Sequence, residues 1–122
     1  MTDQRRDEPS LECLRDRLRD FAEARDWNQF HSPKNLAIAL SVEAGELLEH
    51  FQWISDKDSL TIPDDKLGKI KDEIADVLLY LIRLADLLNV DLIKTAHIKI
   101  ETNARKYPVE KSRGSAKKYT EL

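Results

Sequence analysis

The residues of this chain best suited to chemistry are four carboxylates spaced in two pairs. Glu43 and Glu46 lie three residues apart, and Glu73 and Asp76 repeat that spacing further along the chain. Positions i and i+3 of a helix are about 60° apart and less than one turn along the axis, so the two side chains of each pair would project together. If the two helices are antiparallel, all four carboxylates can converge on one volume.

Carboxylates that gather without basic neighbours must take up protons or bind a cation. Ligands that are all oxygens select a hard divalent ion, and we expect Mg²⁺ first, with Mn²⁺ as its substitute. Mg²⁺ usually keeps waters or takes substrate phosphate oxygens, so such a site is commonly half of a phosphate site. The alternative is surface decoration, because a helical chain with 23 acidic residues contains several such pairs by chance.

Two neighbouring acids are less certain members of the site. Glu49 is the next acid after Glu46 and lies about 120° around the helix from Glu43, so a catalytic or supporting role and simple solvation both stay open. Asp72 faces away from Glu73 and is expected on the surface. A di-iron carboxylate bundle is excluded because it would need Glu-x-x-His pairs, which this chain lacks.

Helices are expected to position these carboxylates. The apolar periodicity predicts four of them, at 11–25, 33–53, about 63–88, and 92–106. Ser10, Ser32 followed by Pro33, and Asp91 are typical helix starts. The third helix is apolar over more than one face, which indicates contact with a second subunit. The predicted fold is therefore an all-α, oligomeric four-helix bundle.

Length and composition agree with one small helical domain. The chain has 122 residues, of which 41% are hydrophobic and 35% charged, with only 3 glycines and 4 prolines. We expect a disordered N-terminus over 1–9, a helical catalytic domain over 10–108 and a basic C-terminal tail over 109–122.

Several classes of protein are disfavoured. The net charge of −3 argues against binding to duplex nucleic acid or an anionic membrane. The start of the chain lacks a signal-peptide pattern, and its longest apolar run is too short to span a bilayer. We therefore expect a soluble, cytoplasmic protein. Cys13, the one cysteine, sits among leucines and is expected to be a small, partly buried apolar residue rather than a reactive thiol.

The segments "SVEAGELLEHFQW" and "DEIADVLLY" resemble the MazG-type all-α nucleoside triphosphate pyrophosphohydrolases. That family carries the acid pattern E-E-x-x-E, a spacer, and E-x-x-D. The positions that match are Glu43, Glu46, Glu73 and Asp76, while Val42 replaces the first acid. This departure, together with "RDWNQFHSPKNL", "FQW", "NARKYP" and "KKYTEL", is similar to the dCTP pyrophosphatase branch.

The resemblance implies a reaction and an assembly. A nucleoside triphosphate would be hydrolysed between its α and β phosphates, with Mg²⁺ held by the four matching acids. The implied substrate is dCTP or 5-modified dCTP, and the implied role is sanitation of the nucleotide pool. Family members form dimers that pair into tetramers, in which the base pocket borrows residues from a neighbouring chain.

The resemblance also implies substrate contacts, at Trp27, His31, Trp53, Tyr80, Lys99 and Asn103. The two tryptophans would stack on the base, and Tyr80 would line the deoxyribose. Lys99 and Asn103 share one helix face and would contact the triphosphate or the base. From the residues alone, a position in the core is the more common role for each tryptophan, and simple solvation is the usual role of a lysine on a helix. For His31, packing within the loop and contact with the ligand are equally open.

Two alternatives remain at this stage. The same chemistry could act on dUTP or on a broad range of dNTPs, because pocket shape decides the base. The chain could also be a non-catalytic helical interaction module, although such a module has no need for matched inward-facing acids on two helices.

Overall fold

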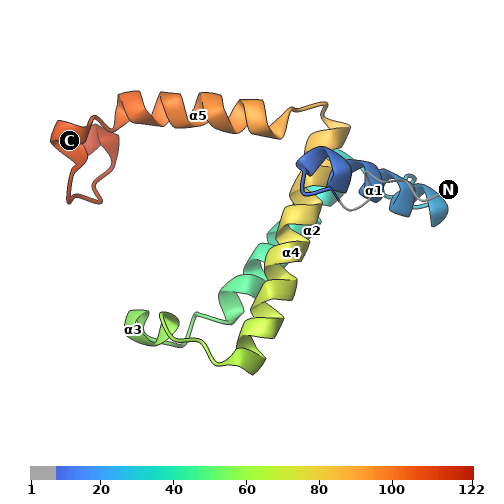
Figure 1. The fold of residues 1–122 in the computed structure, drawn as a ribbon, viewed down its shortest axis with the longest axis horizontal. Coiled ribbons are helices and arrows are strands. Elements are labelled where there is room, and N and C mark those ends of the chain that lie inside the picture. The colour runs from blue at the N-terminus through green and yellow to red at the C-terminus, as the bar shows by residue number, and fades with distance from the viewer. Residues whose placement is uncertain (1–7) are drawn as a thin grey trace. The chain divides into compact units, whose positions relative to one another are not determined.

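The computed structural model describes residues 8–122, and all regular elements in that part of the chain are helices. The long ones are α1 (Leu11–Ala24), α2 (Pro33–Glu49), α4 (Asp64–Leu87) and α5 (Leu92–Lys106) (Figure 1). The short ones are α3 (Asp56–Ser59), α6 (Val109–Ser112) and the 3₁₀ helix η1 (Tyr119–Glu121). The all-α prediction is confirmed. Residues 1–7, most of the stretch predicted as disordered, lie outside the described residues.

The predicted helix starts are confirmed by their capping bonds. The side chains of Ser10, Ser32 and Asp91 each accept a hydrogen bond from the backbone N–H three residues later, at 3.0, 3.1 and 3.0 Å. Pro33 occupies the first helical position of α2, where its missing N–H costs nothing. Each cap satisfies a backbone donor that a helix start leaves unpaired, which is why these residue types mark the boundaries.

The end of α2 differs from the prediction. The helix ends at Glu49 rather than at 53, and the next residues form turns in which Phe51 N donates to Leu48 O at 2.8 Å. Apolar residues continue the helical pattern past the end of the helix, so the periodicity overestimated its length. The segment that follows lies between two predicted helices and contains α3, in which Ser55 Oγ accepts a 3.0 Å hydrogen bond from Asp58 N.

The chain divides into two units, Met1–Asn89 and Val90–Leu122. In the first unit α4 runs antiparallel beside α2 and also packs on α1 (Figure 1). Its buried apolar side chains, contributed by all three of these helices, are Cys13, Ala22, Leu36, Ile70, Ile82 and Ala85. Cys13 is thus buried, as expected. The antiparallel α2–α4 pair is the frame that positions the candidate site.

The second unit contains α5, α6 and η1, and none of the residues in these helices is buried. Tyr119 of η1 meets the ring of Tyr107 at 5.9 Å between centroids, and Lys106 Nζ lies 4.9 Å from the centroid of Tyr119. Part of the predicted tail therefore folds onto the end of α5. Because α5 belongs to this unit, the four-helix bundle stays a prediction. Among residues 8–122 there is no helix with the length and apolar character needed to cross a membrane.

Candidate metal and nucleotide site

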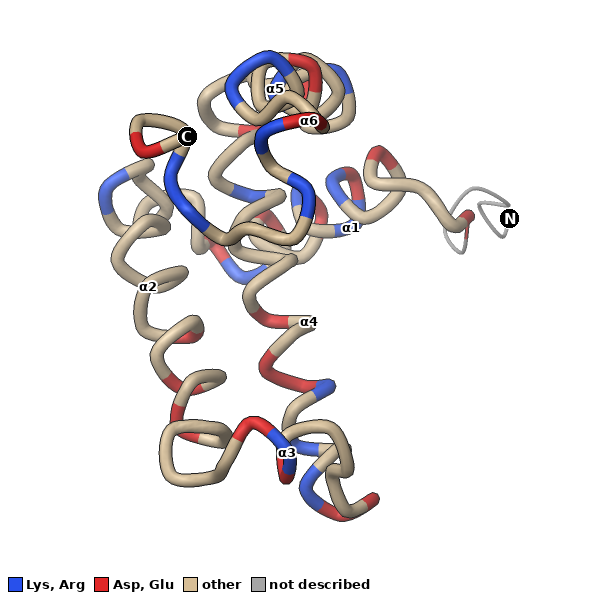
Figure 2. The backbone as a smooth tube through the Cα atoms, turned by 90° about the vertical axis from the view of Figure 1, so that its left-hand side faces the viewer, with Lys and Arg blue, Asp and Glu red and all other residues tan. Residues whose placement is uncertain are grey.

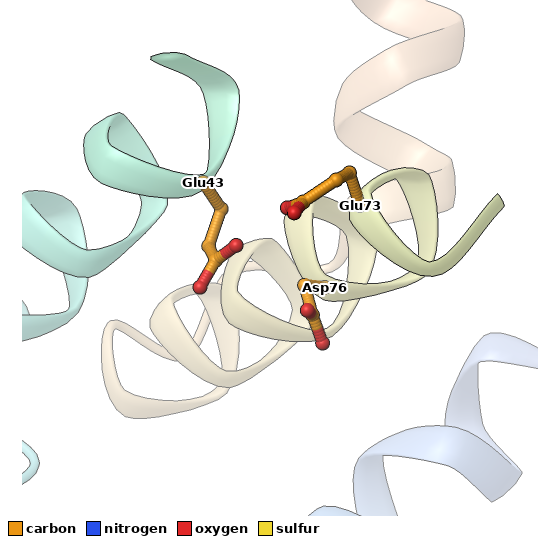
Figure 3. Close-up of side chains that lie close together, drawn as sticks. All are labelled: Glu43, Glu73 and Asp76. Carbon is orange, nitrogen blue, oxygen red and sulfur yellow. The ribbon is translucent and has the colours of Figure 1, made fainter. Parts of the chain in front are cut away.

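Three carboxylates from two helices meet in the first unit. Glu43 on α2 and Glu73 and Asp76 on α4 each offer one carboxylate oxygen, and these oxygens lie within 4.8 Å of one another (Figure 3). Glu73 extends from α4 toward α2, while Asp76 leaves α4 almost one turn further along. The i, i+3 spacing and the antiparallel helix pair together produce this convergence.

The crowding of carboxylates changes the pKa of Glu43. A side-chain hydrogen bond with Glu73 raises the pKa of Glu43 to about 7, and desolvation and the neighbouring Glu46 and Asp76 act in the same direction. Glu46 is not among the three residues whose oxygens converge, but its carboxyl group contacts that of Glu43. Near neutral pH the cluster therefore holds a proton that an isolated carboxylate would have lost.

One oxygen of the cluster is left unsatisfied. Glu73 Oε2 is buried, and within residues 8–122 no N–H or O–H donor lies within hydrogen-bond reach of it. In residues 8–122 neither Lys nor Arg forms an ion pair with Glu43, Glu73 or Asp76. Figure 2 shows acidic segments on both α2 and α4 along this stretch. A proton on Glu43 relieves only part of this repulsion, whereas a divalent cation fits the oxygen-only ligand set and the orphaned oxygen.

Two further residues predicted for the site, Tyr80 and Glu49, lie on the same two helices. Tyr80 is half-buried and four residues after Asp76, on nearly the same face of α4. Glu49 is exposed at the end of α2 and does not belong to the converging group. Its role stays a prediction.

Trp27 and His31 lie together in the loop before α2. The Trp27 ring makes edge contacts with Phe21 at 5.6 Å and with His31 at 6.2 Å between centroids. Arg25 stacks on the Phe21 ring, with its guanidinium carbon 3.6 Å from the ring centroid. Trp27 is nevertheless 43% exposed, so part of this residue remains accessible to a ligand.

Trp53 lies at the opposite end of α2 and is 87% exposed. Pro33 and Glu49, the two ends of α2, are separated by about 25 Å of helical rise. Within one chain, Trp27 and Trp53 therefore stand at opposite ends of the helix. The structure does not bring together the two tryptophans that were predicted to line one base pocket.

Lys99 and Asn103 belong to the second unit. They lie one turn apart on α5, and both are exposed. Their predicted contacts with the nucleotide stay predictions.

The sequence analysis missed a buried arginine. Arg83, on α4, is 7% exposed and donates hydrogen bonds to side chains of the Trp27–His31 loop. It also lies 3.4 Å from Asp86, which in turn receives two bonds from Arg19 on α1, at 2.6 and 2.8 Å. The signal was present, because Arg83 is the only charged residue in the otherwise apolar run "VLLYLIRLA". Such a residue is buried only when it is paired.

Comparison with known proteins identifies the family of this chain. The sequence pattern of the MazG-like family matches residues 38–122, a range that includes all of the converging carboxylates. The chain belongs to the MazG-like family.

Individual relatives narrow the comparison. The chain is 47% identical to dCTP pyrophosphatase 1 of Mus musculus over 117 residues and 43% identical to dCTP pyrophosphatase 1 of Homo sapiens over 118. Each alignment covers 94% of this chain and 69% of the relative. The crystal structure of a pyrophosphatase from Archaeoglobus fulgidus is also similar, with a TM-score of 0.76 and 43% identity, covering 80% of this chain and 92% of that one.

Proposed function

We propose that this protein is a nucleoside triphosphate pyrophosphohydrolase that acts in the cytoplasm on dCTP, or on 5-modified dCTP, and so sanitises the nucleotide pool. Water is added across the bond between the α and β phosphates, giving dCMP and pyrophosphate. The observation that carries the proposal is the convergence of Glu43, Glu73 and Asp76, which form no ion pair with Lys or Arg in the described part of the chain. The relatives named dCTP pyrophosphatase 1, at 43–47% identity, support the choice of substrate.

Mg²⁺ is the proposed ion, with Mn²⁺ as a substitute, because the ligand set contains only carboxylate oxygens. When bound, such an ion neutralises phosphate charge and lowers the pKa of a coordinated water, which supplies a nucleophile near neutral pH. Glu43, Glu73 and Asp76 would hold the ion. Glu46 would add a fourth carboxylate from α2.

The chain's other side chains would hold the nucleotide in place. The exposed ring of Trp27 offers a stacking surface for the base, and the half-buried ring of Tyr80 would lie beside the sugar, on the α4 face that carries Asp76. Lys99 and Asn103 would contact the phosphates or the base. These groups would orient the reacting phosphate, which is a large part of what catalysis of phosphoryl transfer requires.

Self-association is part of the proposal, as dimers or as tetramers made of paired dimers. Large apolar side chains remain exposed on both helices of the central pair: Ile38, Val42 and Leu48 on α2, and Ile74, Leu78 and Leu81 on α4. Surfaces of this kind usually mark an interface. The separation of Trp27 from Trp53 by the length of α2 also favours a base pocket that is completed by a neighbouring chain.

Pyrophosphate release from each of the four dNTPs, with Mg²⁺ and with EDTA, tests the proposal. The variants are Glu43→Gln and Glu46→Gln, and Asp72→Asn is the matched control, since Asp72 is exposed beside Glu73. We expect Mg²⁺-dependent release from dCTP that falls by about 100-fold or more in Glu43→Gln, at least as much as loss of a ligand's supporting partner costs. The Asp72→Asn variant should retain wild-type activity.

The other outcomes are equally informative. Release from dUTP or from several dNTPs would keep the chemistry and change the assigned base. No release from any dNTP, in a chain whose helical circular dichroism is intact, would contradict the proposed function.

A further inference from the structure

Arg83 donates hydrogen bonds through three different nitrogens, and two of these bonds tie the loop before α2 to α4. Its Nε donates to Nδ1 of His31 at 3.1 Å, and its Nη2 donates to Oδ1 of Asn28 at 2.7 Å. Its Nη1 donates to Oδ2 of Asp86 at 3.4 Å. Among residues 8–122 no other charged side chain is buried to this extent. A planar guanidinium that bonds on three sides holds its partners in a fixed geometry.

The bond to His31 determines where that ring carries its proton. A guanidinium only donates hydrogen bonds, so Nδ1 of His31 must present a lone pair, and the proton of the neutral ring must be on Nε2. Desolvation first, and then the charge of Arg83, lower the pKa of His31, which agrees with a neutral ring. Arg83 from α4 is the charged group that bonds His31, and it is itself paired with Asp86, which also bonds Arg19 from α1.

The Nε2–H group of His31 has no hydrogen-bond acceptor within the described part of the chain, although the ring is half-buried. One of its neighbours is Trp27, whose ring lies 6.2 Å away between centroids at an angle of 65°. A fixed donor therefore stands next to an exposed aromatic surface. This is the combination that a planar, polar ligand ring requires.

The donor is also connected to the carboxylate site through α4. Asp76, Tyr80 and Arg83 lie within about 60° of one another around the helix, and Arg83 is about 10 Å along the axis from Asp76. One face of α4 thus carries the carboxylates proposed to hold the metal in its middle, and Arg83, which bonds His31, near its end.

We propose that Arg83 is a positioning residue that holds His31 as the neutral Nε2–H tautomer, so that His31 donates a hydrogen bond to an acceptor atom of the bound nucleotide's base or sugar. The assignment of a nucleotide as the ligand rests on the proposed function. Because this tautomer donates at Nε2 and its Nδ1 is occupied by Arg83, it selects a carbonyl oxygen or an unprotonated ring nitrogen. Cytosine offers both. The same ring cannot accept a bond from an N–H of the ligand.

Nitrogen NMR of the histidine side chains in the full chain tests the tautomer directly. The chain has three histidines, and a His31→Asn variant assigns the signals of His31. We expect wild-type His31 to be protonated at Nε2 alone, at a pH about one unit above the ordinary histidine pKa. In Arg83→Met we expect both tautomers, and a His31 pKa that rises toward its ordinary value. Arg19→Met is the matched control, because Arg19 bonds Asp86 but not His31, and it should keep the wild-type pattern.

The ligand contact is tested with dCMP in the absence of metal. We expect the Nε2–H signal of His31 to shift when dCMP binds to the wild-type protein. In Arg83→Met we expect the Kd for dCMP and the KM for dCTP to rise about 3- to 10-fold, the range for one hydrogen bond, with kcat within about 2-fold. A purely structural role would lower kcat and the fraction of folded protein instead.

Three results would overturn the proposal. One is a wild-type His31 protonated at Nδ1, which decides the matter even if Arg83→Met does not fold. The second is an unchanged tautomer in a folded Arg83→Met variant. The third is a His31 signal that does not respond to dCMP or dCTP. An absence of pyrophosphate release would contradict the proposed function, whereas the tautomer is measured without any turnover, so the two failures are distinguishable.

Discussion

The carboxyl group of Glu43 on α2 forms a side-chain hydrogen bond with that of Glu73 on α4, and this contact raises the pKa of Glu43 to about 7. A contact between two groups thirty residues apart in the sequence thus lets Glu43 hold a proton near neutral pH. The pair couples the stability of the metal-free protein and its affinity for a cation to the same protonation step.

The first prediction concerns the pH dependence of metal-free stability. In the folded protein Glu43 titrates near 7, above its ordinary 4.5, so the folded state binds more protons than the unfolded state in that interval. The stabilising contribution is complete below about 4.5 and is lost as pH rises to about 7. In EDTA we expect the Tm of Glu43→Gln to fall less steeply over this window than that of the wild type. Each kcal/mol corresponds to about 4 °C in a chain of this size.

Thermal melts of both proteins at one chain concentration provide the measurement, because association makes Tm concentration-dependent. Asp72→Asn serves as the control and should keep the wild-type slope. Parallel pH profiles for wild type and Glu43→Gln would show that Glu43 does not titrate in this range.

The second prediction is that metal binding releases a proton. Since Glu43 is about half protonated at pH 7, binding of Mg²⁺ there should release roughly half a proton per site from this group. Below that pH the apparent affinity should weaken by up to tenfold per pH unit. Calorimetric titrations in buffers of different ionisation heat measure the proton count directly. Glu43→Gln should abolish this share of the release, and heats independent of the buffer in the wild type would contradict the assignment.

The convergence of the acids could be predicted from the sequence because it depends mainly on local geometry. The i, i+3 spacing places Glu73 and Asp76 on one face of any helix, and a short connection makes the helix pair antiparallel. The helix starts were predictable for the same reason, since Ser10, Ser32 and Asp91 each act within four residues. The end of α2 was not, because Phe51 and Trp53 continue the apolar pattern beyond the last helical hydrogen bond.

Contacts that depend on how the helices pack could not be predicted from residue spacing. Arg83 and His31 are 52 residues apart, and nothing in the spacing of either residue predicts their bond. The separation of Trp27 from Trp53 likewise follows from the length of a helix that lies between them. The family resemblance implied that both tryptophans serve one pocket, and within a single chain the fold keeps them apart.

The third prediction concerns how much Asp86, the ion-pair partner of the buried Arg83, contributes to the stability of the fold. Asp86 is the only carboxylate that pairs with Arg83 within residues 8–122, and its side chain is 10% exposed. Asp86→Ala leaves a buried guanidinium without its counter-charge, so we expect a loss of about 3 kcal/mol in the free energy of unfolding. Arg19→Met removes a partner that is 51% exposed and should cost only about 0.5 to 1 kcal/mol.

Urea denaturation of the two single variants and the double variant gives these values. Asp86 bonds both arginines, so removing Arg19 from a chain that already lacks Asp86 should change little. We expect the variant with both substitutions to unfold with a free energy at most about 0.5 kcal/mol below that of Asp86→Ala. Equal losses in the two single variants would show that Asp86 serves Arg19 rather than Arg83.

The fourth prediction tests whether the base pocket spans two chains. A stacked base is worth about 1–3 kcal/mol, so Trp27→Ala and Trp53→Ala should each lower kcat/KM for dCTP by roughly 5- to 150-fold. If the two tryptophans of one pocket belong to different chains, mixing the variants under conditions of subunit exchange creates dimers with one intact pocket. Random exchange yields half mixed dimers, so about a quarter of wild-type activity should return.

Each variant taken through the same exchange alone is the control and should stay impaired. A mixture whose activity equals the mean of the two variants would place both tryptophans of a pocket in one chain. The shared-pocket model also requires that dilution into monomers lowers turnover while the carboxylates remain intact. A demonstrably monomeric form with full activity would therefore contradict it as firmly as failed complementation.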